Sequence, residues 1–177
     1  MSMERIAEAV RETAAIFRRR PDLGPGDDSP ATVSWARGLR FEGEHASGRR
    51  IATDMPDRIG GAGGEMTPGW LLRAGVGACT ATCIVIAAAE QGIELTRLEI
   101  RTTSRSDSRG VLGMSEADGS RVEAGAGDYR LAVTIGARNA SREKLLALVE
   151  EGKRRSPIYL ALVRAQPVAV DVEIGET

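Results

Sequence analysis

Both cysteines of the chain lie in the short uncharged segment GVGACTATC, at Cys79 and Cys83. Around them, Thr67-Pro68 is a typical helix start and Gly92 a typical stop, which predicts a long, mostly apolar helix from about residue 68 to residue 91. Cysteines four positions apart share one face of such a helix. A buried cysteine often serves as a small apolar side chain, so the spacing alone leaves packing and thiol chemistry both open.

Other chemistries fit the sequence poorly. His45 is the only histidine and no second cysteine pair exists, so no metal site is predicted. A disulfide between the cysteines is disfavoured, because side chains one helical turn apart rarely meet its geometry. The loop GGAGGE lacks the Lys and Ser/Thr of a phosphate-binding loop and the preceding buried strand of a dinucleotide site. We therefore expect no cofactor, and we interpret this stretch as a mobile surface loop.

An arginine among apolar residues supplies a reason to consider thiol chemistry. The pattern predicts a strand with one buried face, formed by Val33, Trp35, Leu39 and Phe41. Arg37 falls on that face, where a cation is costly unless it is paired. A cation beside a thiol lowers its pKa and favours the thiolate that attacks peroxides. The residue types permit a meeting of Arg37 with Cys79, although spacing alone does not show one.

The remaining elements predict an α+β domain with a largely antiparallel sheet. An amphipathic helix over residues 3–19 and a linker form an N-terminal unit of residues 1–30, and the main domain occupies residues 31–177. We expect strands at residues 47–55, 95–106, 129–137 and 167–174, helices at residues 140–155 and from Ser156-Pro157, and a long polar excursion between residues 108 and 128. A helix buried on several sides in so small a domain favours cover by a partner subunit.

Composition narrows the class of protein. The formal net charge is −1, and basic residues are not clustered, so no nucleic-acid partner is expected. Acidic residues near the N-terminus interrupt any signal-peptide pattern, and the 68–91 helix is too rich in Ala, Gly and Thr for a membrane span. Two cysteines without a secretory signal favour the cytoplasm.

Four stretches resemble the OsmC/Ohr family, the osmotically inducible protein C and organic hydroperoxide resistance proteins. They are ATVSWARGLRFEGE, RIGGAGGEMTPGWLLRAGVGACTA, QGIELTRLEI and SPIYLALVRAQPVAVDVEI. The resemblance implies an OsmC-like fold, in which antiparallel sheets wrap around the long central helices of an intertwined homodimer. Active members of this family are thiol peroxidases that reduce organic hydroperoxides.

The resemblance also implies roles for individual residues. Cys79 matches the peroxide-attacking cysteine, and Arg37 is the better match to the arginine that holds its thiolate, with Arg40 as the alternative. Two positions depart from the family pattern, because Ser156 stands where the resolving cysteine precedes proline, and Gly69 stands where a glutamate follows proline. Glu65 is a candidate substitute for that glutamate.

Three functions remain open on this reading. The first is a one-cysteine, peroxiredoxin-like hydroperoxide reductase that uses Cys79, Arg37 and an external thiol reductant. The second is a non-catalytic dimeric module that binds a small apolar ligand at the subunit interface. The third is a mainly structural dimer.

Overall fold

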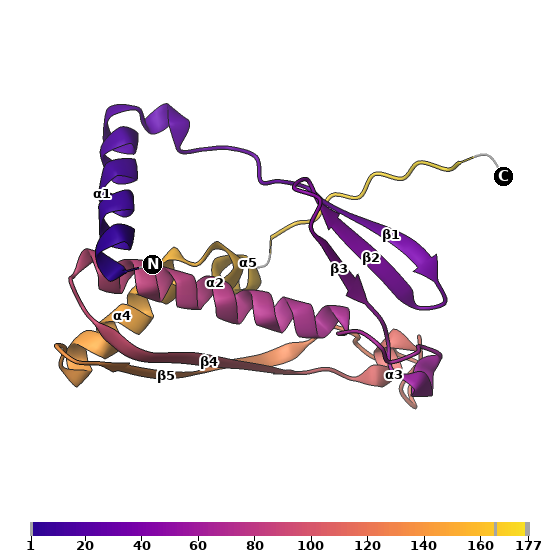
Figure 1. The fold of residues 1–177 in the computed structure, drawn as a ribbon. Coiled ribbons are helices and arrows are strands. Elements are labelled where there is room, and N and C mark those ends of the chain that lie inside the picture. Colours follow the sequence, from indigo (N-terminus) through magenta and orange to yellow (C-terminus); the bar gives the residue numbers. More distant parts are fainter. Residues whose placement is uncertain (1, 165, 176–177) are drawn as a thin grey trace.

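The computed structural model describes residues 2–164 and 166–175, which form an α+β fold with two antiparallel sheets (Figure 1). The elements in chain order are α1 (Met3–Arg19), β1 (Ala31–Arg37), β2 (Arg40–His45), β3 (Arg50–Thr53), α2 (Pro68–Glu90), β4 (Leu95–Arg105), α3 (Ser108–Val111), β5 (Gly127–Ala137), α4 (Arg142–Arg155) and α5 (Pro157–Val163). One sheet has the strand order β1-β2-β3, and the other consists of β4 and β5. The expected α+β class with antiparallel strands and a long central helix is confirmed.

The long central helix α2 begins and ends close to where its sequence signals predict. The Thr67 hydroxyl accepts a hydrogen bond from the backbone N–H of Trp70 at 3.2 Å, and Pro68 occupies the first turn. Gly92 follows the helix with φ = +63°, a left-handed conformation that glycine adopts without steric cost. By length and composition α2 could also cross a membrane, but it contacts α1, β4, α4 and α5 as the core helix of a folded domain does.

The hydrophobic core lies where α2 rests on the β4–β5 ribbon, with α4 beside it (Figure 1). Its buried residues are Ile84, Ala87, Ala88, Ile93 and Leu148. The inward positions of β5 pack against this cluster through Val133 and Ile135, as their alternation predicts. Gly152 lets α4 approach α2 closely, because a Cβ there would lie 2.3 Å from the Ile84 side chain.

The predicted N-terminal helix is present as α1, and its first turns pack on the main body. Ser2 caps the helix by accepting from the Arg5 N–H at 3.4 Å. Ala7 is buried, and Met3 packs against the hydrophobic core. The C-terminal half of α1 and the following linker stand away from α2, and Ile16 and Phe17 are exposed (Figure 1).

The first predicted strand is wrong in its extent and in its burial. A turn at Gly38 and Leu39 divides it into β1 and β2, which pair antiparallel with Trp35 opposite Phe41. Gly38 makes the turn possible with φ = +52°, and its carbonyl accepts a hydrogen bond from Trp35 Nε1 at 2.9 Å. Val33 and Trp35 form an apolar face as predicted, but this face is exposed in the chain, with Trp35 69% accessible.

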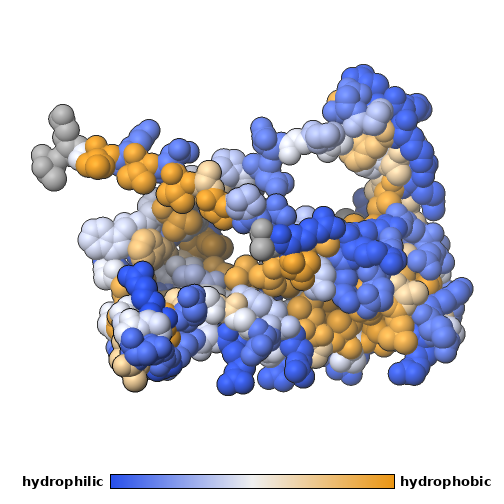
Figure 2. All heavy atoms as spheres, turned by 180° about the vertical axis from the view of Figure 1, so that it is seen from behind, coloured by the Kyte–Doolittle hydropathy of each residue, from blue (hydrophilic) through white to orange (hydrophobic). Residues whose placement is uncertain are grey.

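The C-terminal segment differs from its predicted role as a paired strand. Residues 167–174 are outside any helix or ladder of the described chain, although their apolar residues alternate. Val168, Val170, Val172 and Ile174 are almost fully exposed, and Ile174 reaches 93%. Figure 2 shows these side chains as an apolar strip projecting from the body. The segment has strand composition and no strand partner within the described residues.

The polar excursion between β4 and β5 contains short ordered elements. Asp107 caps the single turn of α3 by accepting from the Arg109 N–H at 2.9 Å. The Arg109 guanidinium pairs with Asp107 at 2.6 Å and with Glu116 at 2.9 Å. These ion pairs fold the excursion back on itself.

Candidate functional site

Cys79 and Cys83 lie one turn apart in the middle of α2, and they differ in accessibility. Cys79 is partly exposed, whereas Cys83 is buried with 9% of its surface accessible. Both are free thiols. Burial raises the pKa of Cys83 above its ordinary value, and the neighbouring Cys79 thiol adds to this rise, while the Arg155 cation opposes it. Of the two thiols, Cys79 is therefore the one that solvent and small molecules can reach.

Ser156 lies beside the cysteine-bearing turn of α2 and is completely buried. Its hydroxyl caps α5 by accepting from the Tyr159 N–H at 3.3 Å. It also accepts from Thr80 Oγ1 at 3.4 Å, and Thr80 is the residue after Cys79. The sequence predicted that a helix starts at Ser156-Pro157, but the contact of Ser156 with α2 depends on the packing of α5. A side chain at position 156 therefore lies at the turn that carries Cys79.

The two candidate arginines lie on the β1–β3 sheet, which does not pack on α2 within the chain (Figure 1). Arg37 is exposed and forms no ion pair within the described residues. Arg40 donates to Glu65 at 2.7 Å and lies 3.5 Å from Glu42. The Glu65 carboxylate raises the pKa of Arg40 above its ordinary value. The structure thus gives Arg40 the partnership with Glu65, and it does not bring Arg37 to Cys79.

The glycine loop is held in place by a buried carboxylate that the sequence did not reveal. Asp54 is almost completely buried, and it accepts hydrogen bonds from the backbone N–H groups of Met55 at 2.7 Å and Ala62 at 3.0 Å. Gly61 passes so close to Met55 that a Cβ would lie 1.7 Å from the Met55 carbonyl oxygen. The loop is therefore anchored at this end. An aspartate at the end of a strand gives no signal for this role, because burial depends on the loop itself.

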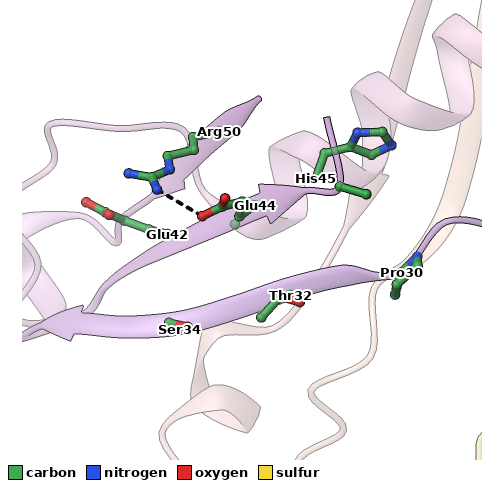
Figure 3. Close-up of a pocket in the computed structure, with 9 residues that line it drawn as sticks. Pro30, Thr32, Ser34, Glu42, Glu44, His45 and Arg50 are labelled. Atoms are coloured by element: carbon green, nitrogen blue, oxygen red, sulfur yellow. Dashed lines mark ion pairs between the residues drawn. The ribbon is translucent and has the colours of Figure 1, made fainter. Parts of the chain in front are cut away.

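A polar hollow of about 440 Å³ lies on one face of the β1–β3 sheet (Figure 3). Thr32 and Ser34 of β1 and Glu42 and Glu44 of β2 line it, and Arg50 pairs with Glu44 at 3.0 Å. His45 at its edge has Nδ1 2.8 Å from Ser47 Oγ. Across residues 2–164 and 166–175, no three His, Cys, Asp or Glu side chains are grouped to hold a metal ion. This hollow holds no thiol, so it is separate from the cysteine site.

Comparison with known protein families identifies the family to which this fold and its cysteine-bearing helix belong. The family model described as "OsmC-like protein" matches residues 61–173, which include α2 and both cysteines. The chain belongs to this family. No curated protein matches it.

Solved structures show the same fold at low sequence identity. An OsmC-like protein from Mycoplasma pneumoniae is 16% identical with a TM-score of 0.64, covering 78% of this chain and 89% of the other. An OsmC-like protein from Vibrio cholerae is 12% identical with a TM-score of 0.61, covering 77% and 94%. An organic hydroperoxide resistance protein from Legionella pneumophila is 20% identical with a TM-score of 0.53, covering 78% and 90%.

Proposed function

We propose that this protein is a thiol-dependent peroxidase that reduces organic hydroperoxides through Cys79. The observation that carries the proposal is the contrast between the two thiols of α2. Cys79 is accessible on the central helix, whereas burial keeps Cys83 protonated by raising its pKa. Membership of the OsmC-like family supports this assignment, since a structurally similar Legionella protein is described as an organic hydroperoxide resistance protein.

The reaction of Cys79 takes two stages. Its thiolate attacks one peroxide oxygen, the O–O bond breaks, and the alkoxide leaves as an alcohol after taking a proton. Cys79 is then a sulfenic acid. An external thiol condenses with it and releases water, and a second external thiol frees Cys79 and leaves with the first as a small disulfide.

An external reductant follows from the residue beside the site. Position 156, at the turn that carries Cys79, holds a serine, and serine cannot form a disulfide. Cys83 shares a helix face with Cys79, but a bridge between them would require α2 to unwind locally. A small thiol or a thiol protein is therefore the proposed source of electrons.

An intertwined homodimer is part of the proposal. The exposed face of β1–β3 is apolar at Val33, Trp35 and Ile51, and the C-terminal segment has no strand partner within the described chain. Exposed apolar patches of this kind mark interfaces. In such a dimer the sheet of one subunit would cover α2 of the other. That arrangement would bring Arg37 or Arg40 from one subunit to Cys79 of its partner.

The test follows Cys79 directly. The reduced protein is mixed with one equivalent of cumene hydroperoxide and a sulfenic-acid trap, and the adduct is measured by intact mass. We expect rapid trapping at one cysteine in the wild type and in Cys83→Ser, and none in Cys79→Ser. Oxidation of Cys79 no faster than that of a free thiol would contradict the peroxidase.

One observation favours a second function, a non-catalytic dimeric module that binds a small apolar ligand between its subunits. The described chain brings no arginine or glutamate to Cys79, and Gly69 has no side chain to orient one. Under this alternative Cys79 would be sluggish toward hydroperoxides, while small apolar ligands would raise the melting temperature of the dimer.

A further inference from the structure

A second groove lies between α2 and β4, on the side of the helix that faces away from the cysteines. It encloses about 420 Å³, a size that suits a small molecule. Its α2 lining includes Trp70, Arg73 and Gly77, and its β4 lining consists of Ile100 and Thr102. At 3.6 residues per turn, Cys79 projects from nearly the opposite side of the helix. The groove is thus distinct from the thiol site.

The floor of this groove changes character along β4. On β4 the alternate residues Ile100, Thr102 and Ser104 face α2. Ile100 and Thr102 form the floor of the groove, which therefore changes from an apolar to a hydroxyl-bearing side chain toward the C-terminal end of the strand. Thr102 Oγ1 is buried and has no hydrogen-bond partner among the described residues. Gly77 makes room for it, because a Cβ at that position would lie 3.0 Å from the oxygen. Buried hydroxyl groups ordinarily have a hydrogen-bond partner, so this free oxygen is a place where a ligand could donate or accept.

Arg73 lies at the hydroxyl end of the groove. Its guanidinium is partly buried, and Nη1 donates to Ser104 Oγ at 3.3 Å. No carboxylate of the described chain pairs with it. Gly69 leaves the space beside it open, since a Cβ there would be 3.6 Å from Nη1. A guanidinium has five N–H donors, and among the described residues Ser104 is the one side-chain partner of this guanidinium.

We infer that this groove binds a small amphipathic monoanion, an alkyl or aryl carboxylate, with its charged end on Arg73 and the Thr102 hydroxyl and its apolar body along the alanines of α2. One guanidinium matches a single negative charge and can hold a carboxylate through two parallel hydrogen bonds. The rest of the lining accepts an apolar chain, because Ala74, Ala78 and Ala81 leave α2 flat beside Trp70 and Ile100. The inference does not depend on the reactivity of Cys79.

Trp70 reports on the groove it lines. The chain has two tryptophans, so in a Trp35→Phe background the emission comes from Trp70 alone. Decanoate is titrated into the protein, and decan-1-ol is the neutral control of equal length. Calorimetric titration of the unaltered chain checks that Trp35→Phe has not changed the groove.

We expect decanoate to shift Trp70 emission and Arg73→Gln to weaken its binding roughly tenfold to a hundredfold, the usual worth of a charge-assisted hydrogen-bonded pair. Arg73→Lys should restore part of the affinity, and decan-1-ol should bind both forms equally. Arg101→Gln, on the exposed face of β4, is the matched control. Circular dichroism confirms that each variant is folded.

Three results would overturn the inference: no binding of decanoate to the wild type, equal binding to Arg73→Gln, or equal binding of decan-1-ol and decanoate. If Arg73→Gln weakens subunit association and leaves decanoate binding unchanged, Arg73 pairs with a carboxylate of a second copy of the chain instead of a ligand. Trapping of Cys79 sulfenic acid is measured on the same variants. Because Cys79 lies outside the groove, its oxidation should be unchanged in Arg73→Gln, so this inference and the peroxidase fail independently.

Discussion

The two halves of the molecule differ in how far one chain completes them. Around α2, α4 and the β4–β5 ribbon, Ile84 and Leu148 are fully buried within a single chain. In the β1–β3 sheet and the C-terminal segment, large apolar residues alternate with polar ones as in a strand that has one buried face. They nevertheless remain exposed, as Trp35 and Ile174 illustrate. The first half is a finished core. The other half has the apolar pattern of a buried sheet, but no further layer of the chain covers its apolar face.

This difference separates two kinds of stabilisation. Residues of the first half contribute to the folding of one chain, whereas the exposed apolar residues contribute only when another surface covers them. Substitutions in the two halves should therefore change different measurements. A core change should alter unfolding itself, and a change in the β1–β3 sheet should alter association.

The largest effect is expected in the finished core. Leu148→Ala removes a fully buried side chain that packs beside Ile84 and Ala88, and it should cost about 2–5 kcal/mol of unfolding free energy. Ile174→Ala, at a nearly fully exposed position, is the contrast and should leave the unfolding of the single chain unchanged. Urea unfolding at low protein concentration measures both. An equal loss of unfolding free energy in the two variants would contradict the proposed difference between the two halves.

The next effect concerns association. Val33→Glu and Val170→Glu each place a charge on an exposed apolar surface of the less complete half. In the proposed dimer this charge would be buried without a partner, at a cost of about 1–3 kcal/mol or more. Sedimentation velocity over a dilution series should show weaker dimers with little change in secondary structure. Thr32→Glu, on the opposite polar face of β1, serves as the control, and dissociation by this variant too would contradict the assigned interface.

A smaller effect is expected at the contact between α5 and α2. Ser156→Ala removes the cap of α5 and the hydroxyl that accepts from Thr80, so we expect a loss of about 1–2 kcal/mol in thermal or urea unfolding. Ser156→Cys tests whether position 156 lies close enough to Cys79 to form a disulfide. Under the proposed function it should let peroxide-treated Cys79 form an intramolecular disulfide, visible as loss of both free thiols. A persistent sulfenic acid in this variant would contradict the assumed proximity.

The sequence predicted local structure well because local structure depends on local signals. Thr67-Pro68 and Ser156-Pro157 mark helix starts that the structure confirms, and the helix predicted over residues 140–155 is present with Ser141 as its cap. It failed at Gly38, where the alternation of apolar residues runs through a turn, since alternation does not record a reversal of the chain. A glycine among alternating apolar residues is the one signal that could have located that turn.

The candidate site was predictable only in part. Cys79 stood out because its segment is uncharged and recognisable, but the relation of Arg37 to Cys79 depends on how sheets and subunits pack. Arg40 and Glu65 are far apart in the sequence, and only the folded loop between β3 and α2 joins them at 2.7 Å. Asp54 and Arg73 gave no signal, because a lone charged residue looks the same whether its environment is solvent or a buried loop.

The smallest effect distinguishes the two thiols by pH. The pKa of Cys83 is raised by burial, so the folded state favours its neutral form. The resulting stability is fully present below the pKa of the unfolded thiol, near 8.5, and is lost as pH rises through the higher pKa of the folded state. Alkylation at pH 8 with iodoacetamide should therefore modify Cys79 well before Cys83, and Cys83→Ala should flatten the decline in stability above about pH 8.5. Equal alkylation of the two thiols in the folded protein would show that α2 opens around Cys83, and the contrast between an accessible and a protected cysteine would no longer support Cys79 as the reactive one.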